Sequence, residues 1–197
     1  MLVHIVDDDP AIARTVARTA SRAGWETACY DSAEGFLAQL DGLPFGCVVS
    51  DINMPGLSGI ELLEAMHRNC PEWPIIMMTG CGQIEDAIRS FRQGAVHFLQ
   101  KPFRQADLLS ALREADDIGS RRQEESRKRD QSKIVGSLSS RETEVLRALA
   151  DGLQSKAIAW QLGISTRTVE MHRSNILAKL GARNTSQAVG LFRSVPV

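Results

Sequence analysis

The sequence lacks long hydrophobic runs, a signal peptide and any large net charge. No segment of the 197 residues approaches the roughly 20 consecutive apolar residues that a membrane-spanning helix needs. The amino terminus runs through residues 1–6 directly into three aspartates, which no secretory signal peptide does. We therefore expect a cytoplasmic protein with no membrane partner.

The sequence also lacks any cysteine pattern of a metal or redox site. Its cysteines, Cys29, Cys47, Cys70 and Cys81, form no Cys-x-x-Cys pair and have no histidine at ligand spacing. Free cysteine is usually buried and inert. Buried free thiols are therefore favoured over metal or redox use.

The formal net charge of −1 hides an uneven distribution. Residues 1–118 carry 9 basic and 17 acidic side chains, residues 119–133 carry 6 and 3, and residues 134–197 carry 8 and 4. A basic segment suits contact with nucleic acid, and an acidic one does not. Because the chain is longer than an average domain, we expect two domains joined near the change of sign.

Strand and helix patterns alternate through residues 1–118. Five strands, each followed by a helix, require right-handed crossovers and a parallel sheet covered on both faces. The fold class predicted is a doubly wound α/β domain with a five-stranded parallel sheet. Strands are expected at residues 2–6, 25–30, 47–50, 74–78 and 95–99, with helices beginning at Asp9-Pro10, Ser32, Gly59, Ile84 and near Arg104.

Polar side chains follow the expected strands at the edge where such sheets bind ligands. They are Asp7 and Asp8 after the first strand, Asp51 after the third, Thr79 after the fourth and Lys101 after the fifth. The carboxylates would repel one another unless a cation shares them, and hard oxygen ligands suit Mg²⁺. The ammonium and the hydroxyl could then hold the oxygens of a phosphoryl group.

Structural interpretations of the same residues compete with this one. Asp9 is expected to be only the N-cap of the helix that Pro10 begins. A single aspartate at a strand end is as often structural as functional, and Lys-Pro is a common turn. Complementary residues at four strand ends together favour the phosphoacceptor site.

The first 118 residues resemble the receiver domain of two-component response regulators, a flavodoxin- and CheY-like fold. The motifs VDDD, SDINMPGLSG, MMTG and LQKPF stand in the order and spacing of that family. The resemblance implies that a partner histidine kinase phosphorylates Asp51, and that Asp8 and Asp51 bind Mg²⁺ directly. It assigns the backbone carbonyl of Asn53 as a further ligand and Asp7 as a ligand through water.

The resemblance also implies how the site signals. Thr79 and Lys101 would hold the phosphoryl oxygens, and Phe98 matches the switch aromatic, with a plain core aromatic as the alternative. Phosphorylation would shift an equilibrium between two packings of the fourth helix and fifth strand. Asp9, where many members have glutamate, and Cys81 are small departures from the pattern.

Residues 119–133 contain no aliphatic or aromatic side chain and mark a boundary between domains. They are rich in helix formers with opposite charges at helical spacing. A charged helical linker is favoured over a flexible tether.

Residues 134–197 predict an all-α domain of four helices. A capping box at Ser139 to Glu142 opens the first, and the second spans about residues 155–162 with Ile158, Trp160 and Leu162. A turn at Gly163 leads into the third near Thr166, and Asn184 caps the fourth. Two helices joined by a tight turn with glycine indicate a helix-turn-helix.

This segment is similar to the LuxR-type helix-turn-helix of the NarL/FixJ regulators over nearly its whole length. The resemblance makes residues 166–180 the recognition helix in the major groove. His172 lies near the apolar stripe, which favours a partly buried structural role over a phosphate hydrogen bond. The candidates for base edges are Arg167, Glu170, Met171 and Ser174, and those for phosphates are Lys156, Thr168, Arg173, Asn175 and Lys179.

The two resemblances together indicate a DNA-binding transcriptional response regulator. Phosphorylation at Asp51 would promote a homodimer that binds promoter DNA as two half-sites about one helical turn apart, with RNA polymerase as a further partner. A phosphatase that uses Asp51 as nucleophile would need a second acid where Asn53 stands, so we expect no turnover enzyme, although the acyl phosphate would decay. The alternative is a phosphate-independent regulator whose receiver serves dimerisation or sensing.

Overall fold

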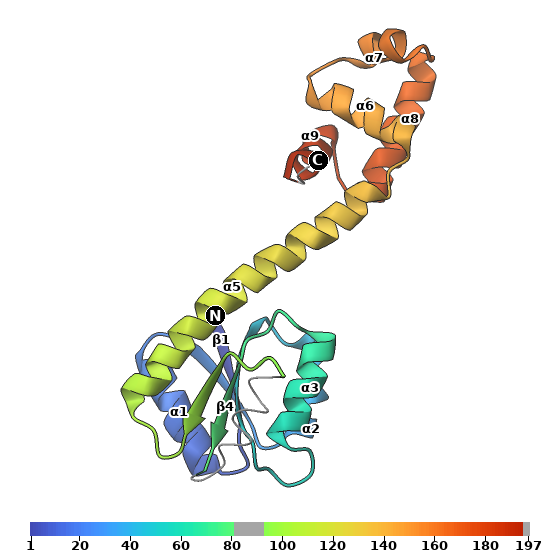
Figure 1. The fold of residues 1–197 in the computed structure, drawn as a ribbon. Helices are drawn as coiled ribbons and strands as arrows, with labels where there is room; N and C mark the ends of the chain where they lie inside the picture. The colour runs from blue at the N-terminus through green and yellow to red at the C-terminus, as the bar shows by residue number, and fades with distance from the viewer. Residues whose placement is uncertain (81–92, 195–197) are drawn as a thin grey trace. The chain divides into compact units, whose positions relative to one another are not determined.

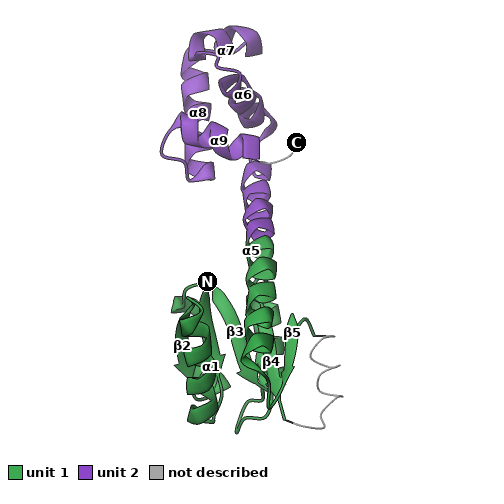
Figure 2. Cartoon of the chain, turned by 90° about the vertical axis from the view of Figure 1, so that its left-hand side faces the viewer, with its two compact units in different colours: residues 1–123 green, residues 124–197 purple. Residues whose placement is uncertain are grey.

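The computed structural model describes residues 1–80 and 93–194. The helix expected at residues 84–91 and Cys81 lie outside the described residues. The chain divides by its contacts into two units, Met1–Gln123 and Glu124–Val197 (Figure 2). Elements of the first unit are β1 (Leu2–Val6), α1 (Pro10–Arg22), β2 (Glu26–Tyr30), α2 (Ala33–Leu37), a 3₁₀ turn (Leu40–Gly42), β3 (Gly46–Asp51), α3 (Gly59–Asn69), β4 (Ile75–Thr79), β5 (His97–Gln100) and the beginning of α5 (Gln105–Gly136).

The first unit contains the predicted parallel five-stranded sheet, in the order β2-β1-β3-β4-β5. Strand β3 lies at its centre and all six of its residues are buried. Its register with β4 pairs Asp51 with Met78, one residue before the end of β4. The doubly wound fold is therefore confirmed, and the last residue of the central strand is an aspartate.

Helices cover both faces of this sheet and produce two hydrophobic cores. Phe36 of α2 and Leu62 of α3 lie in the core on one face, whereas Val16 of α1 and Leu112 of α5 lie in the core on the other. In Figure 1, α2 and α3 accordingly lie opposite α1 and α5. The sheet is therefore shielded from water on both sides, as a parallel sheet requires.

Local capping explains where α1 and α3 begin. The carboxylate of Asp9 accepts a hydrogen bond from the Ala11 amide at 2.7 Å, which confirms its predicted N-cap role. Ser58 and Glu61 form a complete capping box at the start of α3. These caps fix the two chain segments that leave the carboxyl ends of β1 and β3.

The first unit differs from the sequence expectation in the length of α2 and in the burial of its cysteines. The sequence predicts a helix from Ser32 that carries Phe36, Leu37 and Leu40, but the helix ends at Leu37 and Leu40 falls in a separate 3₁₀ turn. Cys29 is exposed because β2 is an edge strand, and Cys70 is half-buried, so of the three described cysteines only Cys47 is the buried thiol expected. Burial raises the pKa of the Cys47 thiol, which disfavours the reactive thiolate.

The core also contains a histidine that no sequence motif marks. The His4 side chain is fully buried, with Nδ1 3.1 Å from the Tyr30 hydroxyl and Nε2 3.1 Å from the Pro44 carbonyl oxygen. Burial lowers its pKa, and the hydrogen bond to Pro44 offsets this in part. The neutral ring is therefore the favoured form in this core.

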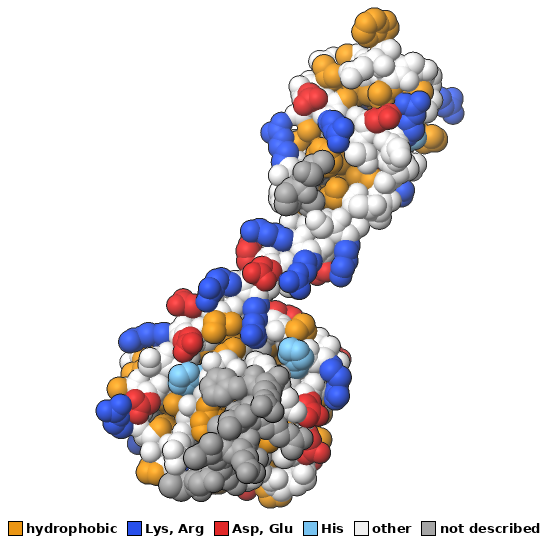
Figure 3. Space-filling model, in the orientation of Figure 1, with side chains coloured by type: hydrophobic (Ala, Val, Ile, Leu, Met, Phe, Trp, Pro, Cys, Tyr) orange, Lys and Arg blue, Asp and Glu red, His pale blue; other side chains and the backbone are white. Residues whose placement is uncertain are grey.

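Helix α5 includes the charged segment expected to be a helical linker. Gly119 is buried, and a β-carbon there would lie 2.9 Å from the Pro74 side chain, so α5 still packs closely on the first unit at this residue. Beyond it, ion pairs at helical spacing join Lys128 to Glu124 and Arg129 to Glu125. Figure 3 shows side chains of both signs along this stretch with little apolar surface. It therefore lacks the apolar seam of a coiled coil.

The second unit contains the four predicted helices around its own core. That core includes Leu146, Ile158, Val169, Ile176 and Phe192. The helices are α6 (Ser140–Ala150), α7 (Ser155–Leu162), α8 (Thr166–Leu180) and α9 (Thr185–Ser194). Among the described residues of both units, no helix is long and apolar enough to span a membrane.

Candidate functional site

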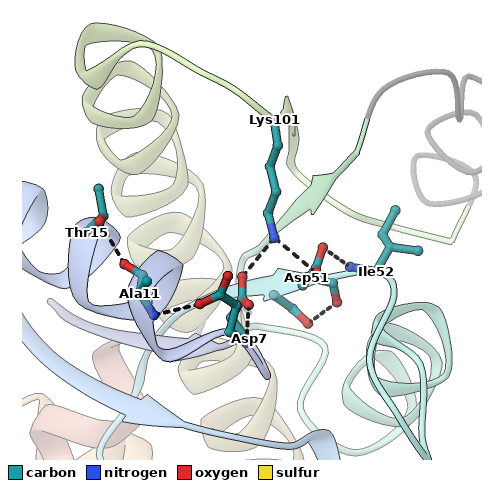
Figure 4. Close-up of polar contacts among 8 residues, drawn as sticks. Asp7, Ala11, Thr15, Asp51, Ile52 and Lys101 are labelled. Carbon is teal, nitrogen blue, oxygen red and sulfur yellow. Dashed lines mark hydrogen bonds and ion pairs between the residues drawn. The ribbon is translucent and has the colours of Figure 1, made fainter.

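The strand ends of the first unit converge on one ammonium group. The Nζ atom of Lys101 lies 2.9 Å from Oδ2 of Asp7 and 3.0 Å from Oδ2 of Asp51 (Figure 4). Asp7 follows β1, Asp51 ends β3 and Lys101 follows β5. The lysine amide also donates to the Thr79 carbonyl at 2.6 Å, which links it to the end of β4. Four strand ends therefore meet in one place, as the sequence predicts.

The second oxygen of each carboxylate is fixed by the backbone. Oδ1 of Asp51 accepts from the Ile52 amide at 2.9 Å, and Oδ1 of Asp7 accepts from the Asp9 amide at 2.9 Å. Each carboxylate thus has one oxygen held by its own loop and the other directed at Lys101. This arrangement leaves the side chains little freedom to reorient.

Burial sets the electrostatics of this cluster. Asp51 is 9% exposed, and burial raises its pKa, while the hydrogen bond and charge of Lys101 lower it in part. Burial by itself lowers the pKa of Lys101, but its hydrogen bonds to Asp7 and Asp51 outweigh this and raise it. The lysine is therefore charged at neutral pH and can stabilise added negative charge at Asp51.

The acidic residues are spaced to share a cation. One carboxylate oxygen from each of Asp7, Asp8 and Asp51 can be chosen so that all lie within 4.8 Å of one another. Asp7 is buried, whereas Asp8 is exposed and leaves an approach from solvent. An all-oxygen donor set that is open on one side fits a hard divalent ion that retains water ligands.

The remaining receiver candidates lie near this cluster along the sheet edge. Thr79 is 1% exposed at the end of β4, and Asn53 is exposed in the loop after β3. Phe98 pairs in register with Met77 and is half-buried against the core that contains α2 and α3. A half-buried aromatic in this place is compatible with a switch residue and with a plain core residue.

In the second unit, α7 and α8 form the helix-turn-helix. Gly163 ends α7 with φ +65°, a left-handed conformation that favours glycine, and the Ile164 amide donates to the Ala159 carbonyl at 3.0 Å. Ser165 then caps α8 by accepting from the Thr168 amide at 3.0 Å. The turn is therefore short and closed by backbone hydrogen bonds.

The candidates for DNA contact differ in their exposure. Arg167, Met171, Ser174 and Asn175 are exposed, and Lys156 is exposed near the start of α7. His172 is half-buried, with an Nδ1 atom that is buried without a hydrogen-bond partner among the described residues. The exposed group can contact a ligand without rearrangement, and the burial of His172 favours the structural interpretation.

Glu170 and Arg173 interact with each other rather than project freely. Oε1 of Glu170 accepts from the Ser155 hydroxyl at 2.6 Å and from Arg173 at 3.0 Å. Arg173 also donates to the hydroxyls of Ser155 at 2.9 Å and Thr185 at 3.1 Å. The pair therefore ties the first residue of α7 and the first residue of α9 to α8, a role that the sequence did not reveal.

Lys179 is also occupied inside the domain. Its Nζ atom lies 2.7 Å from Oε2 of Glu142, a side chain only 5% exposed that completes the capping box of α6 with Ser139. The hydrogen bond from Lys179 and that from the Ser139 amide lower the pKa of Glu142 to about 2. This ion pair joins α6 to α8.

Comparison with known families identifies both units. Residues 3–113 match the response regulator receiver domain, and residues 136–192 match the luxR family of bacterial regulatory proteins. The chain is a response regulator of the NarL/FixJ family. This response regulator therefore combines a receiver with a LuxR-type DNA-binding domain and regulates transcription in a two-component system; its family is not one of catalytic enzymes.

Full-length relatives share this organisation. The response regulator is 40% identical over 193 residues to the transcriptional regulatory protein FixJ of Bradyrhizobium diazoefficiens, covering 96% of this chain and 93% of that protein. It is 33% identical to the response regulator protein TmoT of Ectopseudomonas mendocina, covering 95% and 86%. The structure of the response regulator StyR aligns with a TM-score of 0.67 at 36% identity over 98% of both chains. Full-length FixJ from B. japonicum aligns at 0.59 and 38% identity over 98% and 96%.

The structure of this response regulator also contains polar contacts that sequence reasoning missed. Glu142 is recognisable in the sequence only as part of a capping box. No local signal marks Glu34, whose carboxylate accepts a hydrogen bond from the Leu57 amide. Trp160, expected alongside Ile158 and Leu162, is 89% exposed, whereas Ile158 is fully buried. Helical spacing separates Trp160 from Ile158 by half a turn, which is the one available signal that the two could not share a face.

Proposed function

We propose that Asp51 receives a phosphoryl group from a partner histidine kinase. The observation that carries this proposal is the position of Lys101, whose ammonium bridges Asp7 and Asp51 in the crevice at the strand ends. Phosphorylation of Asp51 adds negative charge and oxygen acceptors beside this fixed cation. Lys101 and the Thr79 hydroxyl then hold the phosphoryl oxygens.

Mg²⁺ is the ion that best fits the acidic donor set. Asp8 and Asp51 would bind it directly, together with the backbone carbonyl of Asn53, and Asp7 would assist through water. When bound, the ion neutralises the negative charge that develops during phosphoryl transfer. Asp51 meanwhile keeps one oxygen on the Ile52 amide, which orients its other oxygen for attack.

We further propose that the phosphorylated receiver rearranges and dimerises. Thr79 moves toward the phosphoryl group, and Phe98 turns into the space vacated next to the core. The acyl phosphate decays by hydrolysis, so the signal lapses unless the kinase renews it. Neither the receiver rearrangement nor the hydrolysis involves Glu142, Ser155 or Thr185, because the contacts of these residues lie within the DNA-binding domain.

The dimer binds double-stranded promoter DNA as two half-sites about one helical turn apart. Exposed side chains of α8, Arg167, Met171 and Ser174, contact base edges, whereas Lys156, Thr168 and Asn175 contact phosphates. Because DNA is its partner, the protein acts in the cytoplasm, where bound dimers can contact RNA polymerase. Glu170, Arg173 and Lys179 contribute mainly by shaping the domain, since each is already bonded within it.

Incubation of the full chain with acetyl phosphate tests the receiver proposal. With Mg²⁺, intact mass spectrometry is expected to show the mass of one added phosphoryl group. When EDTA in excess of Mg²⁺ is present from the start, little of this adduct should form. The phosphorylated sample should protect promoter DNA at lower protein concentration than the untreated sample. No adduct with Mg²⁺ would contradict the phosphoacceptor role, and an adduct without a change in DNA binding would favour the phosphate-independent regulator.

Replacing Lys156 by alanine tests the phosphate contacts. The exposed ammonium has no ion-pair partner among the described residues, so its removal should weaken binding to all DNA sequences alike. The slope of log K against log salt should fall in magnitude by about 1, as expected for one lost phosphate contact. Fluorescence anisotropy across a salt series measures this, and an unchanged slope would remove Lys156 from the interface.

A further inference from the structure

The loop after Asp51 is anchored to the core on its inner side. Ile52 is 3% exposed and Met54 is 8% exposed. The Ile52 amide donates to the Met78 carbonyl at 2.9 Å, and the Gly59 amide donates back to the Ile52 carbonyl at 2.9 Å. These contacts fix the two ends of the segment between β3 and α3, which includes Asn53.

The outer side of the same loop is anchored by one side chain from α2. Oε1 of Glu34 accepts a hydrogen bond from the Leu57 amide at 2.7 Å, across 23 residues of sequence. Gly56 lies against the same carboxylate with φ +77°, and a β-carbon there would lie 2.5 Å from Oε1 of Glu34. The backbone therefore approaches the carboxylate as closely as only glycine allows.

Helix α2, which carries Glu34, is itself held in place by its N-cap and by packing on the core. Ser32 caps the helix, so Glu34 stands in its first turn, where a negative charge is favourable. Ala33 and Phe36 on either side of it are fully buried against the core. Glu34 itself is exposed, so its contribution lies in the hydrogen bond to the loop rather than in core packing.

We propose that Glu34 is a positioning residue for phosphoryl transfer at Asp51. By accepting from the Leu57 amide beside Gly56, it would fix the loop from which the Asn53 carbonyl is proposed to reach the metal. This inference rests on the proposed function, because it assigns Glu34 a role in the same metal-dependent site. Replacing a residue that orients metal ligands typically changes metal affinity by roughly 10–100-fold.

The experiment compares the full-length wild type with Glu34→Ala, Glu34→Gln and Glu26→Ala. Glu26 is an exposed glutamate on β2 and provides a control for the loss of one negative charge from the same unit. The initial rate of phosphorylation by acetyl phosphate is measured over a series of Mg²⁺ concentrations. Urea unfolding of each variant, followed by circular dichroism, reports whether the fold is equally stable.

The Glu34→Ala variant is expected to need about tenfold more Mg²⁺ for half-maximal rate. Glu34→Gln should remain close to the wild type, because an amide oxygen can still accept from Leu57, and Glu26→Ala should match the wild type. A Glu34→Ala protein with unchanged Mg²⁺ dependence would overturn the inference, as would a Gln variant as impaired as the Ala variant. A wild type that acquires no phosphoryl group would instead contradict the proposed function.

A second variant reaches the same contact from the loop. Gly56→Ala places a β-carbon against the Glu34 carboxylate and strains a backbone with φ +77°. It should raise the Mg²⁺ requirement in the same direction as Glu34→Ala. If Glu34→Ala is unstable in urea, the Mg²⁺ dependence of Gly56→Ala is the test instead. An unchanged Mg²⁺ dependence of Gly56→Ala would then overturn the proposal.

Discussion

Full-length protein with Asp51→Asn is expected to acquire no phosphoryl group from acetyl phosphate and Mg²⁺. Asparagine is nearly isosteric, so its amide oxygen can still accept from the Ile52 amide at the position of Oδ1. It has neither the nucleophilic carboxylate oxygen nor the negative charge that a divalent ion requires. The adduct should therefore be absent. Thermal stability should change little, because burial already disfavours the charged Asp51 carboxylate and raises its pKa, which offsets the loss of its ion pair with Lys101.

Asp9→Asn is the matched control for this prediction. Asp9 stands near the same strand end, but its carboxylate caps α1 through the Ala11 amide. Asparagine caps helices about as well as aspartate, so the control should be phosphorylated like the wild type. Peptide mapping of both proteins locates the adduct. An adduct of wild-type yield on Asp8 in the Asp51→Asn protein would show that the acceptor had been assigned to the wrong carboxylate.

Replacing Glu142 by alanine is expected to destabilise the DNA-binding domain strongly. The nearly buried carboxylate accepts from the Ser139 amide at 2.7 Å and from Lys179 at 2.7 Å. Alanine removes both hydrogen bonds, which share Oε2 of Glu142, and leaves the Lys179 ammonium without this partner. The combined cost should be about 2–4 kcal/mol, or a fall in melting temperature of roughly 10 °C or more for a domain of this size.

Glu144→Ala provides the control, because Glu144 lies on the same helix in an exposed ion pair with Arg141. Exposed pairs contribute about 0–1 kcal/mol, so this variant should melt close to the wild type. Circular dichroism measures the melting, and hydrogen exchange of α6 and α8 peptides assigns the change to the second unit. Equal melting temperatures for the two variants would contradict a structural role for the Glu142–Lys179 pair.

The same pair should make the domain sensitive to acid. The folded-state pKa of Glu142 is about 2, below its ordinary value of 4.5. Its stabilisation is therefore fully present above pH 4.5 and is lost as the pH falls from there toward 2, on the order of 2 kcal/mol after allowance for the half-exposed lysine. Glu142→Gln, which does not titrate, should show a smaller loss of stability over this range than the wild type.

The Glu142–Lys179 pair also changes how the DNA contacts are interpreted. The sequence pattern indicates Lys179 and Arg173 as cations available for phosphates and Glu170 as a reader of base edges. In the folded domain, Lys179 bonds to α6, while Glu170 and Arg173 bond to each other and to Ser155. Substitutions at these positions are therefore expected to disturb contacts within the domain as well as DNA binding, so an effect on binding does not by itself identify a base contact.

The order of strands and helices, the position of the acidic cluster and the helix-turn-helix follow from the sequence alone. Apolar periodicity, caps such as Asp9 and Ser139 and the glycine at 163 are local signals, and each acts within a few residues. The carboxyl ends of parallel strands must meet at one edge, so the order of the strands is enough to place the motifs at Asp51 and Lys101 together. The candidate phosphoacceptor site was therefore predictable from spacing and chemistry.

Contacts between residues far apart in sequence were decided only by the tertiary structure. The bond from Leu57 to Glu34, the pairing of Lys179 with Glu142 and the clamp of Arg173 on Ser155 and Thr185 join segments whose mutual approach no local pattern encodes. A charged side chain that would be solvated on an isolated helix takes a partner when packing places one within hydrogen-bond distance. Packing therefore set which charged side chains support the fold and which remain exposed, whereas the local patterns of the sequence were enough to locate the candidate phosphoacceptor site.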